Sequence, residues 1–484
     1  MAQEYSWGCP ELFFPFTTED CLTINIIRPK TPSPDPRGYP VMFFIHGGGF
    51  YQGSSFFYHY SGPLSTIIPC GIIFVSINYR LGPWGWLSTG DERYPGNMGL
   101  WDQIEALKFH KRIIGSFGGD PERITIFGES AGGVSVSWLT LTPHTDGLFS
   151  KAISMSGSSL AIWGHNERVI ESSRVLLSAM ACPLMGGGAV ECLKGKSKND
   201  ILNALKPIMP TVVRRDDLNI VYWGPRIGGA GDLLPGGSLQ EAILRAPKRP
   251  QMIGVNTMEM LTFGVPNIHL TSTELGLIPI PKLSTILLSY ERFCCTLRKI
   301  FGSTQIFGPN APIIAQRIIS FYSSLYYRYP SNPWLHIYLK CLTDVDFTIP
   351  AIREAKLKSL AGWPQMNMYR YSYDNPFVQV IFDPRVKGAA HAMELFNIFD
   401  YSLQFLKPFP HQDSNTVQHN FINIFIDFVQ DRVALPRVSP NAAPFIDINV
   451  VNTVHRDMEP QIVQFWDNLG NEFGFDWPSG DYVF

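Results

Sequence analysis

The stretch RITIFGESAGG, residues 123–133, constrains the fold more than any other part of the sequence. Its β-branched segment at 124–127 predicts a strand, and the small apolar residues at 131–141 predict a helix. Ser130 falls between them in a Gly-x-Ser-x-Gly pattern, which is typical of a tight strand-to-helix turn that exposes a nucleophilic serine. The alternative is a small polar residue in a structural turn, and the flanking strand and helix favour the catalytic interpretation.

Strand-like and helix-like segments alternate along the rest of the chain. Further strands are predicted at 41–45, 71–79, 151–157, 251–256 and 366–374, and residues 99–117 show helical spacing of apolar side chains. Residues 265–365 read as helical pieces broken by Pro and Gly. This pattern predicts an α/β fold with helices on a mainly parallel sheet. No polar linker divides the chain, so residues 1–484 are predicted to form one domain with large insertions.

Composition and charge disfavour several classes of binding partner. The formal net charge is -2 with 17% charged residues, and no basic cluster points to nucleic acid. No apolar run approaches the ~18 residues of a membrane helix. The N-terminus lacks the basic start and apolar core of a signal peptide, so the chain as written is predicted to be cytoplasmic. These observations favour a small, weakly charged substrate.

The segment HGGGF, residues 46–50, ends a predicted strand with three glycines. A serine that attacks a carbonyl creates negative charge on oxygen, which fixed N–H donors must stabilise. Glycines leave backbone N–H groups uncrowded, and the residue after the serine supplies a further donor in such turns. Gly48, Gly49 and Ala131 are therefore predicted to form an oxyanion hole, and the alternative is a flexible turn.

A serine nucleophile needs a histidine base, and the chain contains 11 histidines. Ser, acid and His follow one another in that order along chains with this turn, so the base is expected late. His391 precedes a helix-like run, and its small neighbours are expected to leave the ring accessible. His411, His419 and His455 are also late but have no comparable context.

The acid that orients the histidine is expected between Ser130 and His391, or beside the histidine. Glu259 directly follows a predicted core strand, where a third member of the triad belongs. Glu394 lies three residues after His391, and a shared helix face is expected to bring them together. Spacing does not separate these two from Asp344 and Asp346, and each also fits a solvated surface carboxylate.

Eight cysteines include two closely spaced pairs. Cys9 with Cys21, and Cys182 with Cys192, either close short disulfide loops or remain buried thiols, and spacing alone leaves both interpretations open. No histidine joins them at zinc-site spacing, so no structural metal is predicted.

Several long motifs together resemble the type-B carboxylesterases, the carboxylesterase–cholinesterase branch of the α/β-hydrolases. They are TEDCLTINI (18–26), PVMFFIHGGGFYQG (40–53), SINYRLGPWGWL (76–87), GNMGLWDQIEALKF (96–109), SFGGDPERITIFGESAGGVSV (116–136) and GLFSKAISMSGS (147–158). Looser matches are IGVNTMEMLTF and KGAAHAMELFNIFD. The resemblance covers most of the chain from about residue 18.

This resemblance implies an α/β-hydrolase fold with a deep gorge, and hydrolysis of carboxylic esters through an acyl-serine without a cofactor. It matches Ser130 to the nucleophile, Glu259 to the acid and His391 to the base. It matches Gly48, Gly49 and Ala131 to the oxyanion donors. It also implies that Cys182 pairs with Cys192, and Cys21 with Cys9. Oligomeric state is left open.

The chain departs from the family pattern in three regions. Only 18 residues precede Glu19, where members usually carry a signal peptide and early strands. A truncated isoform or a diverged chain is expected to expose a strand edge and dissolve poorly. If the start is truncated, the whole protein is expected to be secretory; otherwise its cysteines should be reduced.

The other departures concern specificity and the acid. The Cys9–Cys21 loop offers Phe13, Phe14 and Phe16 but no Trp to hold a choline ammonium, which disfavours acetylcholine. Met260 follows Glu259 where the family usually has Gly. The alternatives to an active esterase are a cholinesterase-like adhesion protein, which typically lacks a triad residue, and an inactive truncated form.

Overall fold

The computed structural model describes residues 5–482, except 13, 166, 213–217, 229–231, 235–236, 265–287, 377–382, 384, 400–412 and 433. Phe13, His411 and residues 265–287 therefore lie outside the described residues. The strands are β1 (Ile24–Ile27), β2 (Tyr39–Ile45), β3 (Ile73–Ile77), β4 (Gly119–Glu129), β5 (Lys151–Met155), β6 (Gln251–Asn256), β7 (Met366–Tyr371), β8 (Phe445–Ile448), β9 (Thr453–His455), β10 (Phe475–Asp476) and β11 (Asp481–Tyr482).

The described strands β1 to β9 form one sheet in the order β1-β3-β2-β4-β5-β6-β7-β8-β9. Every pair from β3 through β8 is parallel, and only the outer strands β1 and β9 run antiparallel to their neighbours. The strands β2, β3, β5 and β6 are buried along their whole length. The predicted α/β architecture with a mainly parallel sheet is confirmed, and all six predicted strands are present.

The longer helices are α4 (Met98–Ile113), α5 (Ala131–Leu141), α6 (Arg168–Ala179), α7 (Gly186–Lys194), α8 (Lys198–Val212), α9 (Leu239–Arg245), α13 (Tyr290–Phe301), α15 (Ala311–Ser323), α16 (Pro333–Thr343), α17 (Ile349–Leu360), α19 (Ser414–Gln430) and α20 (Pro460–Phe473). Shorter ones are α1 (Ser55–Tyr58), α2 (Ser61–Thr66), α3 (Gly82–Trp86), α10 (Leu261–Gly264) and α14 (Thr304–Phe307). Single turns are η1 (Ile68–Cys70), η2 (Ile114–Phe117), η3 (Pro143–Thr145), η4 (Tyr326–Arg328), η5 (Asp344–Thr348) and η6 (Met393–Asn397).

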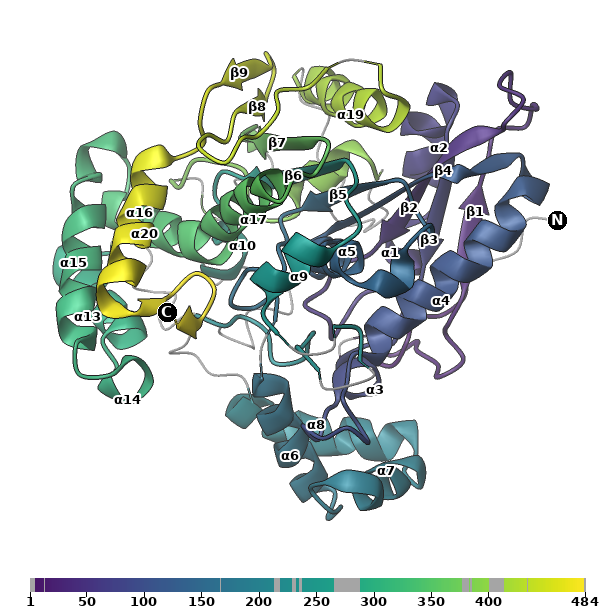
Figure 1. Cartoon of the computed structure of the whole chain (residues 1–484). Coiled ribbons are helices and arrows are strands. Elements are labelled where there is room, and N and C mark those ends of the chain that lie inside the picture. The colour runs from purple at the N-terminus through teal and green to yellow at the C-terminus, as the bar shows by residue number, and fades with distance from the viewer. Residues whose placement is uncertain are drawn as a thin grey trace.

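Helices cover both faces of the sheet because side chains of each strand alternate between them. On β2, Val41 and Phe43 join the apolar cluster that contains α4 and α5, whereas Met42 and Phe44 join the cluster that contains α19. Figure 1 shows α19 on one side of the strands and α4 and α5 on the other. The core is therefore two apolar layers, with the carboxyl ends of the parallel strands meeting at one edge.

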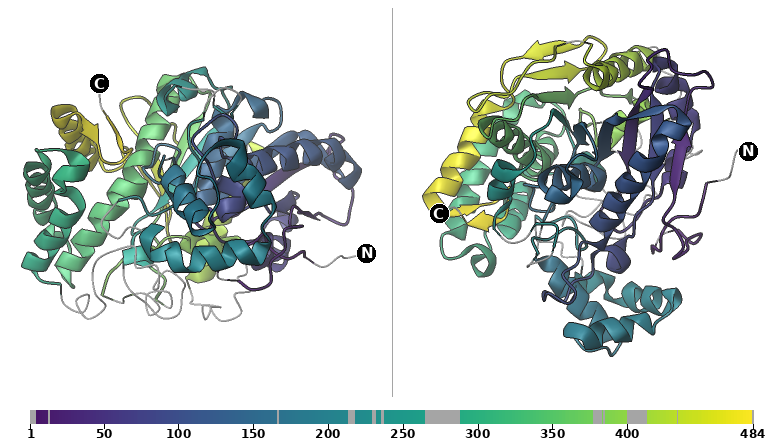
Figure 2. Two further views of the ribbon diagram at one scale, coloured as in Figure 1. Left: turned by 90° about the horizontal axis from the view of Figure 1, so that it is seen from below. Right: turned by 45° about the vertical axis from the view of Figure 1, so that its right-hand side comes forward.

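Two helical groups flank the sheet. Helices α6, α7 and α8 project from the body of the molecule, as Figure 1 and the right view of Figure 2 show. The other group contains α13, α15, α16, α17 and α20. Helices α16 and α17 run on from each other through η5, which is one π-helical turn. Such turns redirect side chains within a helix and are frequent at functional sites.

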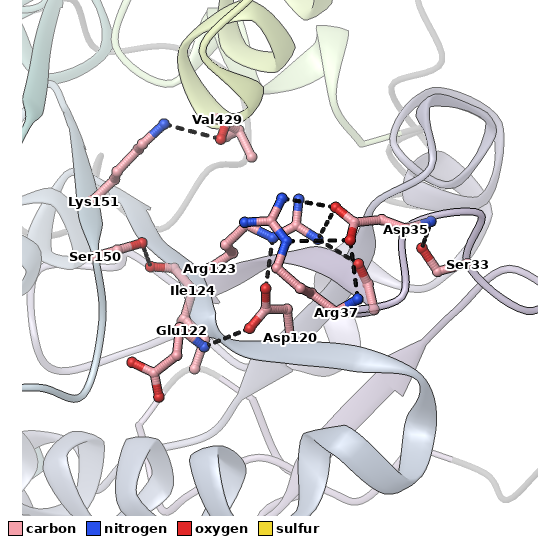
Figure 3. Close-up of polar contacts among 11 residues, drawn as sticks. Ser33, Asp35, Arg37, Asp120, Glu122, Arg123, Ile124, Ser150, Lys151 and Val429 are labelled. Atoms are coloured by element: carbon pink, nitrogen blue, oxygen red, sulfur yellow. Dashed lines mark hydrogen bonds and ion pairs between the residues drawn. The ribbon is translucent and has the colours of Figure 1, made fainter.

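The beginning of β4 lies at the edge of the sheet opposite Ser130, and an ion-pair network surrounds it (Figure 3). Arg123 Nε donates to Asp120 Oδ2 at 2.7 Å, and Arg123 Nη2 lies 3.1 Å from Asp35 Oδ2. Arg37 binds the same Asp35 carboxylate through Nε at 3.2 Å and Nη2 at 2.8 Å. Asp35 and Asp120 thus each have a guanidinium partner.

The two predicted cysteine pairs are disulfides: Cys9–Cys21 and Cys182–Cys192. The second bridge joins the end of α6 to α7 within the projecting group. Among the described helices, none combines the length and the apolar character needed to cross a lipid bilayer.

Candidate active site

Ser130 stands at the turn between β4 and α5, as the sequence predicts. Its backbone has φ 59° and ψ -124°, a left-handed conformation that costs free energy for any residue other than glycine. Two backbone hydrogen bonds hold the turn: Ser130 N donates to Met155 O at 2.9 Å, and Val134 N donates to Ser130 O at 2.9 Å. The strain is therefore stored at one residue, between a central strand and a fully buried helix.

The glycine loop packs directly against this turn. A Cβ atom added to Gly47 would lie 2.6 Å from Glu129 O and 3.0 Å from Ser130 Cβ, so only glycine fits there. Gly48 and Gly49 adopt positive φ of 113° and 58°. Among the described residues, nothing accepts a hydrogen bond from the N–H groups of Gly48, Gly49 or Ala131. Three unused donors thus belong to the turn and to the loop beside it.

His391 lies in the segment between β7 and η6 and meets Glu259, which follows β6. Its Nδ1 is 2.7 Å from Glu259 Oε2. The other oxygen, Glu259 Oε1, accepts hydrogen bonds from Ser156 Oγ at 2.7 Å and Asn256 N at 2.6 Å. The carboxylate is wholly buried, and these donors fix its orientation toward the ring.

The Nε2 atom of His391 is buried and has no hydrogen-bond partner among the described residues. Glu129 Oε1 lies 3.1 Å away, but the angle does not satisfy a hydrogen bond. Glu129 directly precedes Ser130, so Nε2 lies beside the residue that leads into the serine turn. Catalytic hydrogen bonds are often incomplete before substrate binds.

The expectation of an accessible His391 ring is wrong. Its side chain is 6% exposed, and its ring centroid lies 5.0 Å from those of both Phe263 and Phe347. Phe263 comes from α10 and Phe347 from the π-helical turn η5. Small neighbours in sequence do not open the site because aromatic side chains from distant segments close over it.

The other candidates for base and acid lie elsewhere. His419 and His455 are exposed on α19 and β9. Asp344 accepts from Tyr322 Oη at 3.0 Å and pairs with Lys340. Asp346 is buried in the same π-helical turn. These aspartates and both glutamates are buried, so the surface interpretation of the carboxylates is wrong.

Glu394 belongs to a buried polar cluster beside His391 and Glu259. The expected contact between Glu394 and His391 along one helix face is not formed. Its carboxylate accepts from Ser156 Oγ at 3.2 Å and from Asn256 Nδ2. Asn256 Nδ2 also donates to Ala390 O at 2.8 Å. Ser156 and Asn256 thus join the ends of β5 and β6 to the segment of His391.

Burial raises the pKa values of two carboxyl groups in this cluster. The pKa of Glu129 is well above its ordinary value because of burial and then the charge of Glu259. The pKa of Glu394 rises to about 8, first through burial and then through Glu129 and Glu259. Three carboxyl groups in one dry site cannot all be ionised at neutral pH. The raised pKa values favour the protonated, neutral forms of Glu129 and Glu394.

Sequence reasoning missed the roles of Glu129, Ser156 and Asn256. The signal for Glu129 is its place inside the Gly-x-Ser-x-Gly pattern. The signal for Ser156 and Asn256 is that both follow or end predicted strands, whose carboxyl ends share one edge of a parallel sheet. Met260, which stands where the family usually has Gly, fits its turn without strain. Its backbone and that of Glu259 avoid positive φ, and Met260 N donates to Thr343 Oγ1 at 3.1 Å.

The sequence profile of the carboxylesterase family matches residues 2–466. The chain belongs to the carboxylesterase family. It is 33% identical over 479 residues to gut esterase 1 of Caenorhabditis briggsae, covering 96% of this chain and 82% of that protein. It is also 31% identical to bile salt-activated lipase of Bos taurus over 79% of this chain and 62% of the lipase.

Solved structures place this carboxylesterase-family chain in the α/β-hydrolase fold, as predicted. A PNB esterase superposes with a TM-score of 0.72 at 26% identity, covering 96% of this chain and 88% of the esterase. The chain is also similar to neuroligin-2 of Homo sapiens, with 29% identity over 79% of this chain and 44% of that protein.

Proposed function

We propose that this chain is a serine hydrolase that cleaves carboxylic esters through an acyl-serine intermediate. Ser130 is the nucleophile, His391 the general base and Glu259 the acid that orients it. Gly48, Gly49 and Ala131 supply the N–H donors for the oxyanion. Membership in the carboxylesterase family and the relatives named as esterases support ester hydrolysis in general. The assignment of roles to residues rests on the geometry.

One observation carries the proposal: His391 binds a buried carboxylate through Nδ1 and leaves Nε2 unpaired toward the serine turn. The buried carboxylate distinguishes His391 from buried His110, whose ring nitrogens also lack hydrogen-bond partners among the described residues. The fixed contact with Glu259 sets the tautomer in which Nδ1 carries the proton and Nε2 can accept one. The unused N–H groups of Gly48, Gly49 and Ala131 add a second, independent support.

In the proposed reaction, Ser130 Oγ attacks the ester carbonyl while His391 Nε2 takes its proton. The carbonyl oxygen becomes negative and receives the three N–H groups. Collapse of this intermediate breaks the bond to the alcohol, which leaves with the proton from His391, and Ser130 stays acylated. Water then attacks the acyl group with His391 again acting as base, and the carboxylic acid is released.

A fluorophosphonate probe tests the proposal because it reacts only with an activated serine. We expect purified protein to be labelled and to hydrolyse p-nitrophenyl butyrate, and Ser130→Ala to lose both. The matched control is Ser324→Ala, an exposed serine at the end of α15, which should behave as the wild type. Folded, soluble protein that neither reacts with the probe nor turns over the ester would exclude the proposal.

The second candidate is a binding protein of the same fold without catalysis. It is favoured only by the likeness to neuroligin-2. Ser130, Glu259 and His391 are all present, and the contact between His391 and Glu259 opposes this second candidate. The labelling experiment separates the two functions, since a binding protein would remain unlabelled while folded.

The two disulfides support a secretory or extracellular location for the protein. Phe14 and Phe16, in the Cys9–Cys21 loop, pack with Trp7 and Phe56, and Phe16 is 57% exposed. No tryptophan from this loop is available to hold an ammonium group. We therefore propose a neutral ester as substrate rather than acetylcholine.

A further inference from the structure

Helix α17 carries a buried ion pair that the proposed reaction does not use. Lys358 and Glu354 are both wholly buried, and Lys358 Nζ lies 2.6 Å from Glu354 Oε1. Taking two charges out of water is costly, and a well-packed apolar pair of similar volume is often at least as stable. A gain in stability is therefore a weak reason for this pair, and its other hydrogen bonds indicate what else it does.

Each donor of the Lys358 ammonium group has an acceptor. Besides Glu354, Nζ donates to Thr140 Oγ1 at 2.9 Å and to Gln251 Oε1 at 2.7 Å, which uses all three N–H bonds. Thr140 belongs to α5, the helix that follows the serine turn, and Gln251 begins β6. Gln251 Nε2 in turn donates to Ser154 Oγ on β5 at 3.0 Å. One buried charge thus joins α17 to α5 and to two central strands.

The Glu354 carboxylate joins α5 to the segment that follows β5. Its Oε1 accepts from Ser137 Oγ on α5 at 2.7 Å, and its Oε2 accepts from Ser158 Oγ at 2.5 Å. The two serine oxygens also accept backbone bonds, Ser137 from Ser159 N and Ser158 from Leu160 N, both at 3.1 Å. The carboxylate therefore fixes residues 156–160 against α5 through a network of hydrogen bonds.

This segment reaches both parts of the candidate active site. Ser156 has a positive φ of 48°, and its Oγ donates to Glu259 Oε1 at 2.7 Å. Gly157 packs directly on the serine turn, since an added Cβ would lie 2.3 Å from Ser130 O. A shift of the segment would therefore displace the donor to Glu259 and disturb the packing against Ser130 at the same time.

We propose that Glu354 and Ser158 are positioning residues for the contact between Glu259 and His391. They act through Ser156, and this role rests on the hydrolase function proposed above. A strained backbone such as that of Ser156 persists only where the surrounding structure holds it firmly. The bond from Ser158 to a carboxylate supplies that hold, because charge-assisted hydrogen bonds are about twice as strong as neutral ones.

Ser158→Ala tests this role, because it removes one hydroxyl and leaves the ion pair of α17 in place. We expect kcat for p-nitrophenyl butyrate and the rate of fluorophosphonate labelling to fall about ten-fold, with KM changed by less than about two-fold. A small displacement of an orienting group lowers the rate of the chemical step rather than substrate binding.

The matched control is Ser88→Ala. Ser88 is also buried, and its Oγ likewise donates to a main-chain oxygen, Pro95 O, at 2.8 Å. It also accepts from the N–H group two residues later, Gly90 N at 3.1 Å, as Ser158 does from Leu160. The control therefore removes the same kinds of hydrogen bond from the segment after α3, and it should keep the wild-type kcat and labelling rate.

The Nδ1 proton of His391 provides a second readout that needs no turnover. A proton held between this nitrogen and a buried carboxylate is expected to give a downfield proton NMR resonance, which Glu259→Gln identifies by its loss. We expect Ser158→Ala to shift this resonance and Ser88→Ala to leave it in place. A network that served stability alone would lower the free energy of unfolding without moving the resonance.

A variant without either charge tests whether the ion pair and Ser158 act together. We expect Glu354→Gln/Lys358→Met to lower kcat, and adding Ser158→Ala to lower it by less than about two-fold more. Changes that act through one shared contact are not additive.

Two results would overturn the positioning role. The first is a wild-type kcat, labelling rate and His391 resonance in Ser158→Ala, and the second is additive losses in the combined variant. A folded wild type that the probe does not label would instead exclude the proposed hydrolase. The His391 resonance would still decide whether Ser158 positions the contact with Glu259, so the two failures are distinguishable.

Discussion

The charged groups at the two ends of β4 have opposite environments. At Gly119, carboxylates meet guanidinium groups near water: Asp120 binds Arg123, and Asp35 binds Arg37 (Figure 3). At Glu129, the strand ends in a dry site where carboxyl groups face one another and a histidine. The first arrangement lowers the pKa of Asp35 to about 2, chiefly through its hydrogen bonds to Arg37. The second raises the pKa of Glu129 well above its ordinary value, chiefly through burial.

This difference shows how one strand can serve both stability and chemistry. Paired charges hold the amino end of β4 without creating reactivity. At the carboxyl end, burial raises the pKa values of two carboxyl groups, and His391 Nε2 has no hydrogen-bond partner among the described residues. Unsatisfied or strained groups in an otherwise well-packed structure are typical of functional sites.

Replacing one buried acid at each end of β4 should give the largest difference between the two ends. We expect Glu259→Gln to lower kcat for p-nitrophenyl butyrate by about 10³–10⁴-fold, because an amide favours the wrong tautomer of His391. The control Asp120→Asn should leave kcat within about two-fold but lower the free energy of unfolding by about 1–3 kcal/mol. A loss of kcat under about ten-fold in Glu259→Gln would mean that another group orients the base.

The free energy of unfolding should fall as pH rises, because Glu394 lies in the dry cluster at the carboxyl end of β4. The pKa of Glu394 is about 8 when folded, against 4.5 as the ordinary value. Between these pH values the folded state keeps a proton that the unfolded state releases. The free energy of unfolding therefore decreases as pH rises through this window, by up to about 1.4 kcal/mol per pH unit for each such group.

Urea unfolding from pH 5 to pH 8 measures this slope, and Glu394→Gln should make it shallower. The amide mimics the neutral acid and has no proton to lose. An unchanged slope in the variant would show that Glu394 is ionised in the folded protein, with its burial compensated by other groups.

The ion pairs at the amino end of β4 should give stability the opposite dependence on pH, and this effect should be the smallest of those predicted. The lowered pKa of Asp35 gives a contribution that is complete above its ordinary value of 3.8 and is lost as pH falls toward about 2. Because this carboxylate is solvated, the effect of Asp35→Asn should be slight and should vanish in high salt. Acid unfolding at low and high ionic strength measures it, and a salt-independent loss would point to packing rather than charge.

Sequence patterns predicted the parts of this site that depend on neighbours in the chain. The strand, turn and helix around Ser130 and the glycine loop are local features. The choice among Glu259, Glu394, Asp344 and Asp346 is not a local feature. It depends on which segments the sheet brings together. Residues 259 and 391 meet only because β6 and β7 pair in parallel with a fixed register.

Burial was the quantity that sequence reasoning missed most clearly. The small residues around His391 suggested an open ring, but Phe263 and Phe347 come from α10 and η5 to cover it. The raised pKa values of Glu129 and Glu394 likewise result from burial rather than from residue type. Charge states in a dry site are properties of the assembled fold, which no single stretch of sequence encodes.

The strand order also has a consequence for synthesis of the chain. Strands β1 to β5 pair among themselves within residues 24–155, so the serine turn and the glycine loop belong to the part made first. The segments that carry Glu259 and His391 leave the ribosome later, and at ~5–20 residues per second the base follows the serine by roughly ten seconds to a minute. During that interval the nascent chain carries the proposed nucleophile without the groups that are proposed to activate it.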